Sequence, residues 1–115
     1  MPFKSEDVAW AAGLFEGEGT INTGKSYYDN GEKRARKTPQ ITIRIGMTDI
    51  EPLERFAAIF GGSVTGPYKD KRKDWYKPYW FVSVNKAKLV KSAVEAMFPY
   101  LSPRRKEQLG VLYSF

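Results

Sequence analysis

The most informative segment of this chain reads Ala11-Ala12-Gly13-Leu14-Phe15-Glu16-Gly17-Glu18-Gly19. It starts inside an apolar helical pattern and ends in two carboxylates separated by glycine. Carboxylates in the last turn of a helix face the negative end of the helix dipole, which costs roughly 0.3 kcal/mol or more each. Residues that oppose a local stability preference, without a visible compensating interaction, often mark a functional site. The segment therefore predicts a helix that delivers Glu18 to a fixed position.

The length and composition indicate one folded domain spanning residues 1–115. A net charge of +6 favours an acidic partner, either nucleic acid or an anionic membrane. No apolar run approaches the roughly 18 residues that a membrane span needs, and residues 1–7 lack the apolar segment of a signal peptide. We therefore expect an intracellular protein, cytoplasmic, organellar or phage-encoded, that is not secreted and has no membrane partner.

The chain contains neither cysteine nor histidine. Disulfides, thiolate metal sites, Ser-His-Asp hydrolysis and imidazole acid–base chemistry are therefore excluded. Any catalysis must come from carboxylates, lysine, arginine, tyrosine or a hard metal ion.

Apolar spacing and turn residues predict four helices and four strands. In chain order we expect a helix capped by Ser5 or Asp7 and ending near Phe15 or Glu16, strands 20–28 and 40–47, a helix from Thr48 or Asp49 to about Phe60, strands 63–68 and 79–84, and helices 86–98 and 103–112. Two αββ units in succession indicate an internal pseudo-repeat. The order predicts an α+β fold, αββαββα, with a four-stranded antiparallel sheet and helices on one face.

The other face of the sheet is expected to be polar and basic. Gln40, Thr42 and Arg44 alternate with isoleucines, so they should point away from the helices and form a saddle for DNA. Arginine suits guanine edges and glutamine suits adenine edges in a major groove. A strand of about ten residues spans roughly 33 Å, close to ten base pairs.

Two basic segments, 25–37 and 69–77, fall at predicted hairpin tips, which we expect at the same end of adjacent hairpins. One such segment is often only a solvated loop, but two in a basic protein favour phosphate contacts. The predicted DNA-binding residues are Lys25, Tyr27, Arg34, Arg36, Lys37, Gln40, Thr42, Arg44, Lys69, Lys71, Arg72, Lys73 and Lys77.

Small residues recur along the first helix at Ala9, Gly13 and Gly17. Such a line lets two backbones approach closely, and two copies of the helix about a two-fold axis would bring two Glu18 side chains together. The predicted homodimer interface comprises Ala9, Ala12, Gly13, Glu16 and Gly17. The Glu18 carboxylate and the Gly17 carbonyl would then suit Mg²⁺. The alternative is a helix that simply ends in a glycine cap with two solvated acids.

Near the other end of the chain, Ser102-Pro103-Arg104-Arg105-Lys106 places three cations at a helix N-terminus, against the dipole. An anionic ligand would resolve this conflict, and a cation near a scissile phosphate could stabilise developing charge. The alternative is a charged first turn of a surface helix.

The segment Ala11 to Gly19 resembles the LAGLIDADG homing-endonuclease motif in its Gly-Glu-Gly variant. The resemblance extends over nearly the whole chain through Thr48-Asp49, Phe60-Gly61-Gly62, and Phe98-Pro99-Tyr100-Leu101 before the basic cluster. One motif in a chain of this length resembles the single-motif, homodimeric branch of the family.

The resemblance implies site-specific cleavage of double-stranded DNA with Mg²⁺ at a long, pseudo-palindromic site, in a protein of intron or intein mobility. Mn²⁺ would substitute, Ca²⁺ would bind without cleavage, and no small-molecule substrate is expected. Glu18 matches the metal-binding acid, Gly17 a residue whose carbonyl can join the metal, and Glu16 an acid that is usually structural. Arg104 or Lys106 matches a basic residue of the catalytic pocket.

Two positions depart from the family pattern. Ala11 replaces the opening leucine, which affects packing more than chemistry. Met47 stands where many members keep a polar, water-organising residue, and Arg44 is the catalytic alternative there.

A second interpretation is a non-cleaving DNA- or RNA-binding protein on the same scaffold, either a regulator or an intron-splicing maturase. The intact Glu18 favours the enzyme, because a pure binder has no need of an acid there. A third interpretation, a binder of membrane surfaces or acidic proteins, does not explain the helix-end acids.

Overall fold

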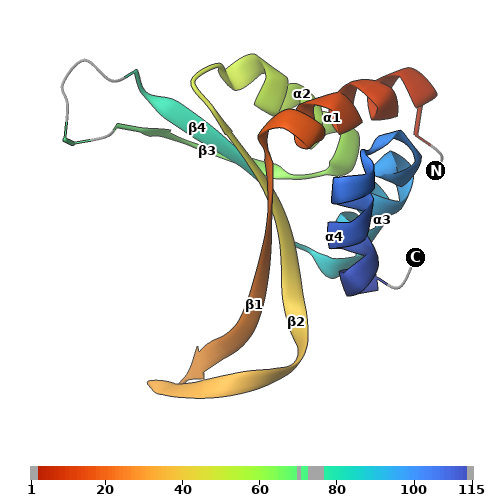
Figure 1. Cartoon of the computed structure of the whole chain (residues 1–115). Coiled ribbons are helices and arrows are strands. Elements are labelled where there is room, and N and C mark those ends of the chain that lie inside the picture. Colours follow the sequence, from red (N-terminus) through yellow and green to blue (C-terminus); the bar gives the residue numbers. More distant parts are fainter. Residues whose placement is uncertain (1–2, 70, 73–76, 114–115) are drawn as a thin grey trace.

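The fold is seen in a computed structural model that describes residues 3–69, 71–72 and 77–113 (Figure 1). Its elements, in order, are α1 (Ser5–Glu18), β1 (Gly19–Asp29), β2 (Glu32–Met47), α2 (Ile50–Phe60), β3 (Ser63–Tyr68), β4 (Tyr79–Val84), α3 (Ala87–Met97), the 3-10 helix η1 (Phe98–Tyr100) and α4 (Pro103–Tyr113). The predicted α+β fold and the order of its helices and strands are confirmed.

β1 and β2 form a long hairpin whose turn is made by Asn30 and Gly31, with φ of 51° and 83°. An Asn-Gly pair with positive φ at both residues is the preferred two-residue hairpin turn. β2 begins at Glu32, eight residues before the predicted start. Residues 32–37 are all exposed, so no burial alternation marks this part of the strand in the sequence. This part of β2 forms instead because its backbone pairs with β1 next to the turn.

The sheet order is β1-β2-β4-β3, and every neighbouring pair is antiparallel. The second strand of each αββ unit therefore lies at the centre, where Ile43 pairs with Val84 and Met47 with Trp80. The prediction that both hairpin tips lie at the same end of the sheet is therefore wrong. Because β2 and β4 run in opposite directions, the β1–β2 and β3–β4 hairpins leave the sheet at opposite ends (Figure 1).

The helices cover one face of the sheet, as predicted (Figure 1). That face buries Ile43 and Ile45 from β2 and Val82 and Val84 from β4. The helices bury Phe15, Leu53, Phe56, Val90, Val94 and Met97 against them. Full burial of each large apolar side chain contributes about 1.5–3 kcal/mol, so this layer holds the sheet and helices together.

α1 begins at Ser5, and Lys4 stands at its N-cap without a side-chain hydrogen bond. The predicted caps, Ser5 and Asp7, both lie inside the helix. At the other end the helix continues to Glu18, beyond the predicted stop. Both acids of the opening motif are therefore helical residues. Across the part of the chain that the structure describes, no helix has the length and apolar character to span a membrane.

Candidate active site

The two acids at the end of α1 have different surroundings. The Glu16 carboxylate accepts hydrogen bonds from the main-chain N–H of Ser102, at 2.7 Å, and from the Ser102 hydroxyl, at 2.9 Å. The Arg104 guanidinium lies 3.7 Å from the same carboxylate. The N–H of Ser102 has the largest effect and lowers the pKa of Glu16; burial raises it, and the Ser102 hydroxyl, Arg105 and Arg104 lower it further.

These contacts place the Glu16 carboxylate at the N-terminus of α4. Two of the three cations that begin α4, Arg104 and Arg105, therefore lie near a carboxylate of their own chain, and Glu16 takes the place of the anionic ligand expected there. The favourable position of an anion at a helix N-terminus resolves the conflict seen in the sequence. Glu16 is thus engaged within the chain at a junction between α1 and α4, and its predicted place in a dimer interface stays a prediction.

Arg105 completes this junction from the other side. Its side chain is buried, with 7% of the residue exposed. One guanidinium nitrogen, Nη2, donates to the carbonyl of Gly19 at 2.7 Å and to that of Glu16 at 3.3 Å. The other, Nη1, donates to Gln108 at 3.2 Å. The last carbonyls of a helix have no partner within the helix, and Arg105 supplies both hydrogen bonds and positive charge to the C-terminal end of α1.

Burial is the largest influence on Arg105 and lowers the pKa of its guanidinium; Arg104 also lowers it, and Glu16 raises it. A guanidinium stays charged in proteins despite such shifts. Arg105 is absent from the predicted site residues, although the sequence carries a signal. Leu101, Arg105 and Leu109 recur every four residues, and both leucines are buried. An arginine in that line points into the core.

Glu18, the last residue of α1, is exposed. The two carbonyls that Arg105 holds belong to Glu16 and Gly19, which flank Gly17 and Glu18 in the chain. The backbone on both sides of Glu18 is thus fixed, while its carboxylate faces solvent.

The oxygen donors at this point suit a hard divalent cation. Mg²⁺ is usually held by one or two carboxylates together with water and substrate phosphates, and Glu18 with the Gly17 carbonyl offers one carboxylate and one carbonyl. Among the described residues no group of three acidic side chains gathers into a metal-binding cluster. A metal ion at Glu18 therefore fits the kind of donor present, with the remaining ligands coming from water, phosphate or a second copy of the chain.

The outer face of α1 carries the small residues expected there. Ala9, Gly13 and Gly17 are exposed, and a Cβ placed at either glycine would meet nothing within 4 Å. Ala12 is different, because it is 1% exposed and packs in the core. Its predicted place in the dimer interface is wrong, because it lies on the inner side of the helix.

The two candidate catalytic cations of α4 also lie in different places. Arg104 is exposed and reaches Glu16, two residues before Glu18. Lys106 is half-buried, and its ammonium lies 5.7 Å from the centre of the Phe98 ring. The structure therefore brings Arg104 to the end of α1 and holds Lys106 against η1.

Arg44 lies on the helix-free face of the sheet, on the strand beside the α1–β1 junction. It pairs with Thr20 of β1 and with Ser83 of β4. Its guanidinium lies 3.7 Å from the centre of the Phe81 ring, and its Nε is buried without a hydrogen-bond partner among the described residues. Met47 is half-buried against the core and offers no polar group. Arg44 is thus the polar side chain of β2 nearest Glu18 along the pairing.

The remaining predicted DNA contacts spread along the same face and out to the hairpins. Gln40 is exposed and Thr42 is half-buried. The guanidinium carbon of Arg36 lies 5.1 Å from the centre of the exposed Tyr27 ring. Arg34 forms exposed ion pairs with Asp29, at 3.5 Å, and Glu32, at 3.2 Å. The exposed cations further include Lys37, Lys69, Lys71, Arg72 and Lys77. The side chain of Lys25 and all of Lys73, Trp75 and Tyr76 lie outside the described residues.

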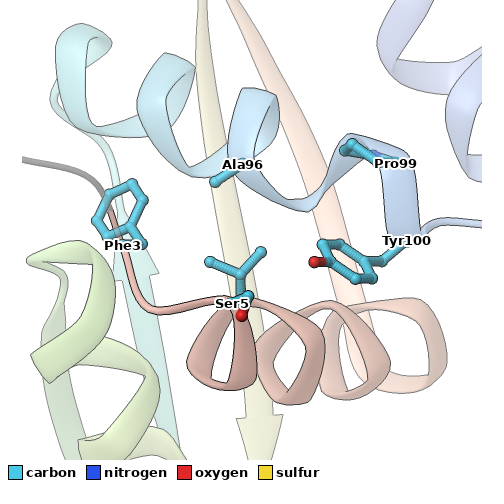
Figure 2. Close-up of a pocket in the computed structure, with 6 residues that line it drawn as sticks. Phe3, Ser5, Ala96, Pro99 and Tyr100 are labelled. Carbon is cyan, nitrogen blue, oxygen red and sulfur yellow. The ribbon is translucent and has the colours of Figure 1, made fainter.

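A separate hollow of about 290 Å³ opens between the start of α1, α3 and η1 (Figure 2). Its lining is mostly apolar: Phe3, Ser5, Val8, Ala96, Pro99 and Tyr100. At 1.5 Å rise per residue, Ser5 and Glu18 lie about 20 Å apart along α1. The hollow is therefore not part of the candidate active site.

Comparisons with known proteins identify the fold. No family model matches the chain. The intron-encoded RNA maturase bI4 of Saccharomyces cerevisiae is 36% identical over 72 residues, which are 63% of this chain and 10% of the maturase. The homing endonuclease I-CvuI, in complex with its target, superimposes with a TM-score of 0.67 at 19% identity, covering 95% of this chain and 65% of that one. I-CeuI, a group I intron-encoded homing endonuclease complexed with DNA, superimposes with a TM-score of 0.69 at 13% identity. This match covers 99% of this chain and 55% of the I-CeuI chain.

The chain has the fold of the LAGLIDADG homing endonucleases. It spans a tenth of the maturase and about two thirds or less of the solved endonuclease chains that it matches. Within that fold, the end of α1 and the helix-free sheet face are the two surfaces with candidate functional residues.

Proposed function

We propose that the chain acts as a site-specific, divalent-metal-dependent DNA endonuclease and works as a homodimer. The observation that carries the proposal is the exposed Glu18, held at the fixed end of α1 beside an exposed face of small residues. The enzymes of like fold, I-CvuI and I-CeuI, were solved on DNA, which supports the same kind of substrate.

In this proposal two copies of α1 pack through Ala9, Gly13 and Gly17 and bring two Glu18 carboxylates together about a two-fold axis. These carboxylates, with the Gly17 carbonyls, hold Mg²⁺ or Mn²⁺. A metal ion in this position supplies Lewis-acid activation of water and of the scissile phosphate. I-CvuI complexes with DNA were solved in the presence of Ca and of Mg, which supports use of divalent cations.

The chain's own residues do the remaining work. Arg105 keeps the backbone around Glu18 in place through the carbonyls of Glu16 and Gly19. Arg104 at the start of α4 and Arg44 on β2 provide positive charge for the phosphate as negative charge develops. Preorganised cations of this kind lower the barrier because they need not reorient during the reaction.

The helix-free sheet face is proposed to lie along the major groove, with the basic hairpins on phosphates. β1 has 11 residues and spans about 36 Å, or roughly ten base pairs. Because a homodimer repeats this surface across its axis, the target is a long, nearly palindromic site. Binding through many phosphates also requires that affinity fall steeply as salt rises.

The test is incubation of the protein with a library of randomised duplex DNA, separately with Mg²⁺, Mn²⁺, Ca²⁺ and EDTA. We expect specific cuts with Mg²⁺ and Mn²⁺, and specific binding without cuts in Ca²⁺. Tight, specific binding with no cuts in any divalent cation would overturn the enzyme proposal.

The dimer has its own test. Sedimentation of the protein on its selected DNA should show two chains per site, and Gly13→Glu, which puts a charge on the small-residue face, should leave one. The matched control is Ala58→Glu at an exposed position of α2. A single chain bound to its complete site would contradict the shared-acid arrangement.

The match to the RNA maturase bI4 favours a second candidate function, an RNA-binding splicing helper on the same fold. It would use the sheet face and hairpins on RNA and would not need Glu18. Acceleration of group I intron splicing that survives Glu18→Gln, in the absence of DNA cutting, would favour it over the endonuclease.

A further inference from the structure

Phe81 lies on β4, one of the two central strands, beside the candidate catalytic Arg44. Val82 and Val84 are buried against the helices, so the alternation along β4 places Phe81 on the helix-free face. The guanidinium carbon of Arg44 lies 3.7 Å from the centre of the Phe81 ring. A cation so close to the face of an aromatic ring is attracted by the negative charge of that face.

The Phe81 ring is itself held in place by its neighbours. Gly46 pairs with Phe81, and a Cβ at Gly46 would come within 2.6 Å of the ring. The ring therefore lies over the backbone of β2, in the space that glycine leaves. Its centre also lies 5.4 Å from that of Tyr79, edge-on, and 5.9 Å from that of Tyr68. These contacts limit the movement of the ring before any ligand arrives.

The position of the ring turns Arg44 towards the end of α1. Phe81 lies at the level of Gly46, which is two residues after Arg44 in β2. Because β1 and β2 are antiparallel and Arg44 pairs with Thr20, two residues in this direction lead on the other side from Thr20 back to Glu18. To reach the ring, the Arg44 side chain leans in that direction. Its guanidinium therefore lies closer to the level of Glu18 than its own backbone does.

The ring is also the contact that orients the Arg44 guanidinium. Within the described residues Arg44 has no hydrogen bond or ion pair, and its Nε is buried without a partner. A guanidinium is flat and carries its donors at its edge in a fixed fork. A ring against its face therefore leaves the terminal amino groups able to donate to a phosphate.

We propose that Phe81 is a positioning residue for Arg44 and, through it, for the scissile phosphate. The inference rests on the proposed endonuclease function, in which Arg44 supplies positive charge during cleavage. Phe81 does not touch the DNA. Seated on Gly46, its ring holds the guanidinium so that the terminal amino groups face the phosphate near Glu18. Such an arrangement is set before the reaction and needs no reorientation during it.

The test uses the full chain and its selected duplex DNA. Single-turnover cleavage is measured with Mg²⁺, and the dissociation constant is measured in Ca²⁺. Phe81→Leu should lower the cleavage rate by about ten- to a hundred-fold, the scale of a misplaced catalytic group, and should change the dissociation constant by less than about two-fold. Phe81→Tyr keeps the ring and should keep the rate within about two-fold. Thermal unfolding shows whether each variant is folded.

A double-mutant cycle separates positioning through Arg44 from a general structural role. In an Arg44→Met background, Phe81→Leu should lower the rate by less than about two-fold, because the group that it positions is already gone. The matched control is Arg55→Met, which removes a similar cation, 4.1 Å from the Trp10 ring in the helical layer, and should leave the rate unchanged. An equal loss from Phe81→Leu in both backgrounds would overturn the proposal.

Arg44→Lys keeps the charge but loses the flat group, so it tests the stack even where Phe81→Leu does not fold. It should lower the rate by about ten-fold or more, and a full rate would overturn the proposal. A wild-type chain that cuts no DNA contradicts the endonuclease function and the role of Phe81 with it. A wild type that cuts DNA, with Phe81→Leu equally fast, contradicts the role of Phe81 alone.

Discussion

Glu16 and Glu18 are the same residue type two positions apart at the end of one helix, and the fold uses them in opposite ways. Glu16 is half-buried and bound by Ser102 and Arg104, whereas Glu18 is exposed at a backbone segment that Arg105 fixes. Two acids that both oppose the helix dipole therefore need not share one explanation. One acid is compensated by a second helix of the same chain, and the other is left exposed to solvent.

The largest effect is expected from removal of the exposed acid. Glu18→Gln should lower the rate of DNA cleavage by at least about a hundred-fold, because the metal loses its carboxylate. Stability should change by less than about 0.5 kcal/mol, since the side chain is at the surface. Single-turnover cleavage and urea unfolding measure the two quantities, and Glu54→Gln at an exposed acid of α2 is the matched control. Equal rates for Glu18→Gln and wild type would remove Glu18 from the active site.

Removal of the buried cation, Arg105, should mainly lower the stability of the fold, whereas removal of Glu18 should mainly lower the cleavage rate. Arg105→Met should destabilise the fold by about 2–4 kcal/mol, because the carbonyls of Glu16 and Gly19 lose their donor. Arg104→Met, which breaks only an exposed ion pair, should cost less than about 1 kcal/mol. Urea unfolding at neutral pH compares the two variants. Similar losses for both would show that burial of Arg105 has no special role.

The smallest effect concerns pH. The pKa of Glu16 is lowered in the folded protein, so the unfolded chain binds more protons as pH falls below the ordinary glutamate value of about 4.3. The stabilisation by Glu16 is therefore complete above that value and disappears as pH falls through the folded pKa.

Glu16→Gln should be less stable than wild type at neutral pH and should lose less stability on acidification, as measured by thermal unfolding across an acid series. Ser102→Ala should shift the profile in the same direction but by less, because the main-chain N–H remains. Identical acid profiles for wild type and Glu16→Gln would contradict the assignment of this carboxylate.

The same contrast shows what a sequence can predict. Apolar alternation and turn residues mark both ends of β3 and β4, and they predict the observed bounds of these strands. They do not predict the start of β2, because residues 32–37 are exposed on a projecting hairpin and carry no burial pattern. Local signals also favour hairpin tips at one end of the sheet, whereas the pairing of β2 with β4 puts them at opposite ends.

At the candidate site, the sequence shows which residue types are present, but it does not show which side chains contact one another. The spacing of small residues locates the outer face of α1, but it does not separate exposed Ala9 from buried Ala12. The cations of α4 indicate an anion, yet that anion lies 86 residues away in the chain. Helical propensity and charge act locally, and only the packing of α4 against α1 shows that the two conflicts compensate each other.

The junction between α1 and α4 also has a consequence for the order in which the protein matures during synthesis. The residues that hold the end of α1 lie at positions 102 and 105, downstream of the helix itself and of all four strands. A ribosome that has made the helix with its acid, and even the whole sheet, has not yet made the group that holds that acid in place. In synthesis, α1 and the four strands are therefore complete before the residues that hold the end of α1, and the backbone around Glu18 is fixed only after Ser102 and Arg105 have been made.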